Sequence, residues 1–190
     1  NSRNGGWVGG NYWKFIMDRQ GRVVWALLTD DQHWTIYIQP SYDGTAILWD
    51  KSSYWADWDG GRDSQIFRMK IDGTILDTYD VPGEHHVFRE LADGSIVWGA
   101  ASGSSETLEK LNPDGSQETI WDCRTFHQSL DISRSCQSNT LYWHESEDTF
   151  LFSFYTTNTV VEIDHQTGAT LRQWGGDLPQ SWDFDPANSV

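Results

Sequence analysis

The chain has 190 residues, enough for one domain with a substantial hydrophobic core. Its 28 acidic and 13 basic residues give a formal net charge of −15, a field that repels phosphate backbones and anionic membranes and so argues against nucleic-acid partners. No stretch approaches the roughly eighteen apolar residues that a membrane-spanning helix needs, so no membrane span is expected. Because the sequence begins at Asn1 without a signal-like segment, we expect a processed chain or a piece of a longer protein.

Strand-turn-strand units recur along the chain, and each turn contains Asp and closes on Gly. They are KFIMDRQGRVVWAL (14–27), IFRMKIDGTILDTY (66–79), TLEKLNPDGSQETIW (107–121) and VVEIDHQTGATLRQW (160–174). A second series of acidic turns, each followed by an apolar run, lies between them at 41–50, 91–100 and 146–155. Gly accepts positive φ and Asp bonds its own backbone, so these turns favour tight hairpins.

The runs between the turns are rich in Val, Ile, Thr, Tyr, Phe and Trp, which is strand composition. Counting them predicts about fourteen strands and no helix longer than a turn or two. The best helix candidate is SSETLEKL (104–111), which Asn112-Pro113 would end. Six tryptophans fall inside the runs and are expected to pack in the core: Trp25, Trp49, Trp98, Trp121, Trp143 and Trp174.

A repeat of this length predicts an all-β protein of the β-propeller type, with about three and a half four-stranded blades. We expect a single domain over 1–190, with blades near 40–82, 83–122 and 123–176 and partial blades at both ends. A propeller closes with about four to eight blades, so the remaining blades would come from another segment, another chain or a second copy. An irregular β-sandwich is the alternative, although its strands would be spaced more evenly.

Two cysteines, Cys123 and Cys136, lie thirteen residues apart. We expect a disulfide across a hairpin, which implies an oxidising compartment and hence a secreted or periplasmic protein. Two free buried thiols are the alternative.

Two segments resemble the bacterial arylsulfotransferase-like propellers. HHVFRELADGSIVWGA (85–100) is similar to a blade opening of that family, and 139–176 is similar to the blade that follows. The resemblance covers about half of the chain, 85–176. It implies transfer of a sulfuryl group from a phenolic sulfate to a phenol through a covalent histidine adduct, without a dissociable cofactor.

The family's polar positions carry over only in part. His86, with His85 beside it, matches the first histidine motif, but Val87 stands where the family has an acid. Asn139 matches a second motif, in which Gln137 replaces a histidine, and Tyr155 replaces an arginine. The family's nucleophilic histidine lies beyond a segment similar to 182–190, where this sequence ends.

Two functions therefore stay open. The chain is either a binding or structural module that has lost catalysis, or part of an active sulfotransferase in which His86 and His85 act and Asn139, Gln137 and Tyr155 bind substrate. Whether it is an enzyme is left undecided. A small aryl or glycan ligand could also stack on the loop tryptophans Trp55 and Trp58.

Further candidates lie in acidic and histidine-containing segments. Asp57, Asp59 and Asp63 surround Gly60-Gly61 and could hold Ca²⁺, the alternative being a solvated acidic loop. His127, between the cysteines, could replace the missing family histidine, the alternative being a solvated loop residue. His144 and His165 are expected to be structural or exposed.

Overall fold

The computed structural model describes residues 12–29, 37–54, 60–103 and 105–175. The chain divides into two compact units, residues 1–85 and 86–190, and each is described by itself. The described residues form fourteen strands, as the sequence predicts, together with the short helix α2.

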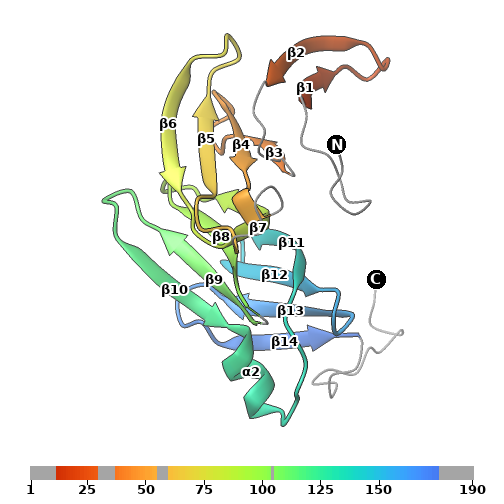
Figure 1. The fold of residues 1–190 in the computed structure, drawn as a ribbon, viewed down its shortest axis with the longest axis vertical. Helices are drawn as coiled ribbons and strands as arrows, with labels where there is room; N and C mark the ends of the chain where they lie inside the picture. Colours follow the sequence, from red (N-terminus) through yellow and green to blue (C-terminus); the bar gives the residue numbers. More distant parts are fainter. Residues whose placement is uncertain (1–11, 30–36, 55–59, 104, 176–190) are drawn as a thin grey trace. The chain divides into compact units, whose positions relative to one another are not determined.

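The first unit contains a two-stranded hairpin and a four-stranded antiparallel sheet (Figure 1). The hairpin consists of β1 (Tyr12–Met17) and β2 (Val23–Thr29). The sheet consists of β3 (Ile38–Pro40), β4 (Ile47–Lys51), β5 (Gln65–Met69) and β6 (Ile75–Asp80), and its spatial order follows the chain. Such a meander is the strand order of a propeller blade.

Aromatic rings make contacts within the sheet of the first unit and between the sheet and the hairpin. Trp49 of β4 stacks on Phe67 of β5, with 4.5 Å between the ring centroids. The ammonium of Lys14 lies 3.7 Å from the centroid of the Trp49 ring, and the Trp25 indole donates a hydrogen bond of 2.6 Å to the Ile71 carbonyl. Lys14 is buried, so its charge is held by the face of an aromatic ring.

The second unit contains two further four-stranded meanders, with α2 (Cys123–Ser129) between them in the chain. The first is formed by β7 (Glu84–Glu90), β8 (Ile96–Ser102), β9 (Ser105–Leu111) and β10 (Gln117–Asp122). The second is formed by β11 (Ser138–His144), β12 (Thr149–Phe154), β13 (Thr159–Asp164) and β14 (Thr170–Trp174).

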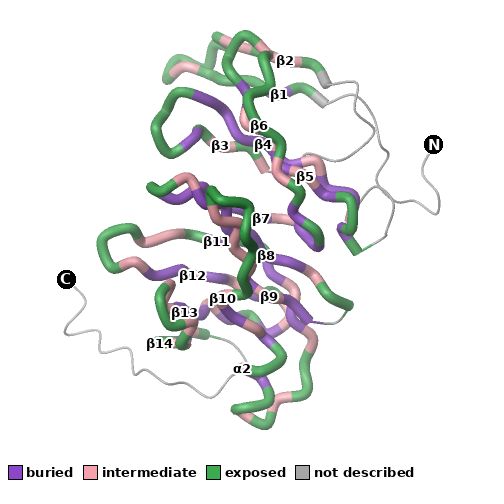
Figure 2. Tube along the Cα trace, turned by 90° about the vertical axis from the view of Figure 1, so that its left-hand side faces the viewer, coloured by how far each residue is buried: buried purple, intermediate pink, exposed green. Residues whose placement is uncertain are grey.

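The core of the second unit is built from both of its sheets and includes Val97, Leu108, Trp121, Phe150, Phe152 and Ile163. Figure 2 shows the buried segments in the middle strands of the sheets, whereas the hairpin tips are exposed. Of the last strands of the four-stranded sheets, β6 is mostly exposed, whereas β10 and β14 mix exposed residues with half-buried and buried ones. Of the six tryptophans assigned to the core, Trp49, Trp98 and Trp121 are buried and the other three are half-buried.

The predicted turn glycines adopt the backbone conformation that the turns require. Gly21, Gly73, Gly115 and Gly168 have φ of 79°, 92°, 85° and 67°. Gly168 has a second role, because a Cβ there would lie 2.2 Å from the Ile120 carbonyl oxygen of β10. In the same turn the Asp164 carboxylate accepts hydrogen bonds of 2.7 Å from the backbone and hydroxyl of Thr167.

The predicted helix at 104–111 is wrong, since residues 105–111 form strand β9. Leu108, which is fully buried, pairs with Gly99 of β8, and the register continues from Ser102 to Ile96. Pairing with β8 and burial of the Leu108 side chain outweigh the helical propensity of this segment, which is weak over so few residues.

Candidate functional site

Two positions at which the sequence departs from the arylsulfotransferase-like pattern lie together in the second unit. The Tyr155 hydroxyl donates a hydrogen bond to the side-chain oxygen of Gln137, and the Tyr155 amide donates one of 3.1 Å to the Gln137 carbonyl. Asn139 follows Gln137 by two residues and is exposed on β11. At these two positions, two neutral groups therefore bond each other.

The two predicted catalytic histidines occupy successive positions of β7. His85 is buried and packs against Tyr54, with 4.9 Å between the ring centroids. His86 is half-buried, and desolvation holds the pKa of its imidazole below the usual 6.5. Because successive side chains of a strand point to opposite faces, only one of the two would face a given ligand. At neutral pH His86 is the uncharged imidazole.

Several predicted site residues lie outside the described part of the chain. These are Trp55, Trp58, Asp57 and Asp59. Asp63 is described and exposed, and its amide donates a hydrogen bond of 3.0 Å to the Ser53 hydroxyl. The calcium site and the aromatic platform remain predictions.

The predicted disulfide between Cys123 and Cys136 is present. The expectation that it spans a hairpin is wrong: it joins the first residue of α2 to the end of residues 130–136, called the strap hereafter. The strap folds back on α2, since the Ile132 amide donates a hydrogen bond of 3.0 Å to the His127 carbonyl. The Asp122 side chain caps α2 by accepting a 2.7 Å hydrogen bond from the Thr125 amide.

His127 is not a solvated loop residue. It is 3% exposed, on the face of α2 that the strap covers. Its Nδ1 lies 3.3 Å from the Arg134 carbonyl oxygen and 3.5 Å from the Cys136 sulfur. The ligand atoms of Cys123, His127 and Cys136 lie within 4.8 Å of one another, but a disulfide offers no thiolate to a metal ion.

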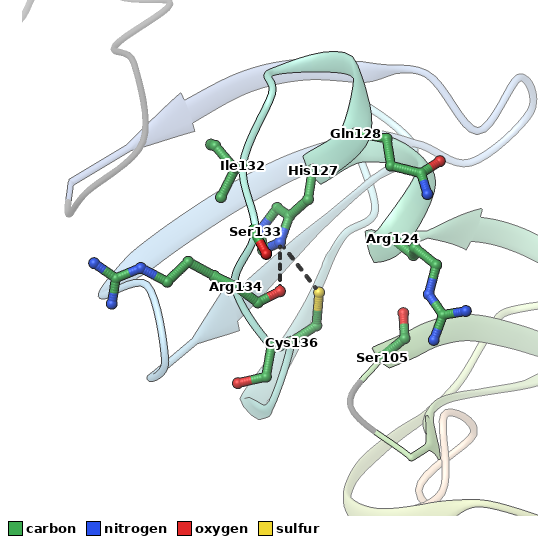
Figure 3. Close-up of a pocket in the computed structure, with 9 residues that line it drawn as sticks. Ser105, Arg124, His127, Gln128, Ile132, Ser133, Arg134 and Cys136 are labelled. Atoms are coloured by element: carbon green, nitrogen blue, oxygen red, sulfur yellow. Dashed lines mark hydrogen bonds between the residues drawn. The ribbon is translucent and has the colours of Figure 1, made fainter.

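A cavity of about 440 Å³ opens between α2, the strap and the start of β9 (Figure 3). Its wall includes Ser105, Arg124, His127, Gln128, Arg134 and Cys136. Ser105 and Arg124 were not among the candidates that the sequence pattern suggested. The one available signal was Arg124 itself, a cation beside a cysteine in a strongly acidic chain.

A buried carboxyl group, Glu106, lies at the contact between the two sheets of the second unit. Burial raises its pKa to about 7, although the amide and the hydroxyl of Ser138 both donate hydrogen bonds to it and so oppose the shift. A Cβ on Gly99 would lie 2.8 Å from a Glu106 carboxylate oxygen, so the glycine provides space for this carboxyl group. The group has a structural role, because it joins β9 to β11.

The other two histidines of the described residues, His165 and His144, have structural contacts, as expected. His165 contacts Asp148 at 2.8 Å and packs edge-on against Phe150 at 5.2 Å. His144 lies at the end of β11, 3.7 Å from the Glu147 carboxylate. Among the helices of the described residues, none is long and apolar enough to cross a membrane.

Comparison with known proteins bears on the fold. No family model matches the chain, and no curated protein matches it either. A solved structure of a protein of unknown function from Bacteroides caccae is similar, with a TM-score of 0.57, 20% identity and coverage of 95% of this chain. A streptogramin B lyase structure is also similar, with a TM-score of 0.56, 16% identity and coverage of 87%.

The chain spans 61% and 51% of the length of those two structures. At such identities the likeness establishes the architecture and not the activity. Together with three complete four-stranded meanders and a further hairpin, it identifies an all-β protein of the β-propeller type.

Proposed function

We propose that the chain is part of an exported, propeller-type binding module related to the arylsulfotransferase-like family, and that it does not itself transfer sulfuryl groups. The hydrogen bond between Tyr155 and Gln137 carries this proposal. A sulfuryl-transfer site must stabilise negative charge that develops on the sulfuryl oxygens, which requires cations or strong donors aimed at them. Here the Tyr155 hydroxyl donates its hydrogen bond to the Gln137 side chain, and neither side chain carries a positive charge.

Export is supported by the disulfide between Cys123 and Cys136, since such bonds persist in oxidising compartments. The chain spans about half to three fifths of its structural neighbours. We therefore also propose that further blades, from another segment, chain or copy, complete the ring.

The competing function is that of one part of an active aryl-sulfate sulfotransferase. It is favoured by the half-buried, neutral state of His86, because an unprotonated imidazole is the form that can attack sulfur. In that case the anion-stabilising groups would have to come from blades outside this chain.

An assay of sulfuryl transfer from 4-nitrophenyl sulfate to a phenol separates the two functions. It should use the longest natural form of the protein, compared with its His86→Ala variant. We expect release of 4-nitrophenol by both proteins to equal the rate without protein. Turnover that His86→Ala abolishes would refute the binding-module proposal.

A further inference from the structure

The cavity beside α2 has the opposite charge character to the rest of the molecule. The chain carries 28 acidic residues, yet none of the described residues that line this cavity is Asp or Glu. Arg124 and Arg134 both line it. A cavity that gathers arginines in a chain of net charge −15 concentrates positive potential at one place, which favours an anionic ligand.

Arg124 is the cation available to a ligand. Its guanidinium makes no hydrogen bond and no ion pair with any described residue, and the residue is exposed on α2. In Figure 3 its guanidinium extends from α2 toward Ser105, whereas the guanidinium of Arg134 points away from both. A planar guanidinium without a partner can bind two oxygens of a carboxylate or sulfate group at once.

A buried hydroxyl lies in the same wall without a partner. Ser105 is 7% exposed, and its Oγ makes no hydrogen bond with any described residue. A buried hydroxyl without a hydrogen-bond partner lowers the stability of the fold, so buried hydroxyls normally have such a partner. A ligand oxygen in the cavity would accept this hydrogen bond.

The frame of the cavity is fixed before a ligand arrives. The disulfide joins α2 to the end of the strap, and the His127 ring is held between the Arg134 carbonyl at 3.3 Å and Cys136. Ser105 is the first residue of β9 and pairs with Ser102 of β8. A wall of this kind loses little conformational entropy on binding.

From these observations we propose that the cavity beside α2 binds the oxyanion group of a small organic acid, with the Arg124 guanidinium and the Ser105 hydroxyl as its donors. A cavity of about 440 Å³ exceeds a single inorganic anion and admits a small organic body attached to the charged group. The inference rests on the proposed function in one respect, namely that the chain binds a small ligand.

Calorimetric titration of the whole chain with benzoate, benzenesulfonate and benzyl alcohol tests this site. We expect both anions to bind and the neutral alcohol not to bind. Arg124→Gln should weaken binding of the anions about 10-fold or more, as expected for a lost charge-assisted pair. Arg19→Gln, which removes an equal charge from an exposed turn of the first unit, should leave binding unchanged.

Ser105→Ala separates a ligand contact from a structural role. Removing an unpaired buried hydroxyl should leave the melting temperature unchanged or raise it, while binding of the anions weakens about 3-fold or more. The matched control is Ser95→Ala, which removes another buried serine hydroxyl of the same unit outside the cavity and should not affect binding.

Absence of binding at 10 mM anion, about the weakest affinity that a specific site would show, would overturn the proposal. So would equal weakening by Arg19→Gln and Arg124→Gln, or wild-type binding by Ser105→Ala. These results differ from failure of the proposed function. Turnover of 4-nitrophenyl sulfate together with Arg124-dependent binding of benzoate would refute the absence of catalysis and leave the α2 site in place.

Discussion

Single residues decide which polar groups of this protein are structural and which are open to a ligand. Glu106 and Ser105 are neighbours in β9, yet they differ in this respect. The Glu106 carboxyl group receives two hydrogen bonds from Ser138, whereas the Ser105 hydroxyl has no partner among the described residues. Neither environment follows from local sequence, because Ser138 lies 32 positions away from Glu106.

The raised pKa of Glu106 predicts a loss of stability as pH rises. Below pH 4.5, the ordinary pKa of a glutamate, the folded and unfolded states both hold the proton, and between pH 4.5 and the folded-state pKa of about 7 only the folded state does. The free energy of unfolding should therefore fall across this window, by about 3 kcal/mol at most. Urea titrations at pH 4.5 and 8 should show this fall.

The isosteric variant Glu106→Gln should remove most of that pH dependence and be more stable than the wild type at pH 8, since an amide can accept from the Ser138 amide and donate to its hydroxyl. Glu118→Gln changes an exposed carboxyl group of β10 and serves as the control. Equal pH slopes in the wild type and Glu106→Gln would refute the assignment.

At the level of elements, the turns were predictable and the crossover between the two sheets of the second unit was not. The glycine turns follow from the residues inside them, because positive φ and the Asp side chain act locally. The position of His127 depends on the strap folding back on α2. The spacing of Cys123 and Cys136 predicted that they would bond but could not show which element lies between them.

Two glycine-to-alanine variants test the contact between β10 and the turn before β14. Gly115→Ala adds a methyl group at φ 85° with no atom within 4 Å, so only backbone strain opposes it, at a cost of about 1–2 kcal/mol. Gly168→Ala adds the same strain plus a Cβ placed 2.2 Å from the Ile120 carbonyl oxygen. We expect it to cost at least about 2 kcal/mol more.

Chemical denaturation of the two variants gives this difference directly. Equal destabilisation would mean that Ile120 and the Gly168 turn do not touch in solution. The hydrogen bond of 2.9 Å from the Trp121 indole to the Thr170 hydroxyl crosses the same contact.

At the scale of the whole molecule, the repeat made the fold predictable. Alternating strands and Asp-Gly turns at a blade-like spacing predicted the all-β propeller-type architecture. The single-domain boundaries and the blade limits remain predictions. The sandwich alternative is wrong, because each four-stranded sheet completes its meander before the next begins. The cavity beside α2 could not be predicted, since its wall joins β9 to residues beyond β10.

The same turn chemistry predicts how the molecule responds to acid. Hydrogen bonds from Ser116 hold the pKa of Asp114 below its usual value, and hydrogen bonds from Thr167 do the same for Asp164. A carboxyl group with a lowered pKa in the folded state stabilises the fold at pH values above 3.8, its pKa in the unfolded state. This stabilisation is lost as the pH falls through the pKa of the folded state. We expect cooperative acid unfolding below about pH 4.

Asp164→Asn should lessen this acid sensitivity, because the amide keeps the turn and carries no charge. Asp131→Asn, at an exposed position with φ of 56° that Asn tolerates, is the control. Circular dichroism between pH 2 and 7 would follow both variants. An unchanged acid midpoint in Asp164→Asn would contradict the role assigned to the turn carboxylates.

The turn at Gly168 ends one hairpin and also abuts the preceding sheet, and this has a consequence for blade exchange. A blade taken from another propeller and inserted in place of residues 138–174 would supply its own hairpins but not a match to Ile120. Recombination or design at this boundary would succeed only if the incoming blade brought a glycine to the site of close approach. The contact between neighbouring blades therefore depends on the sequence of the turn and not on the sequence of the strands.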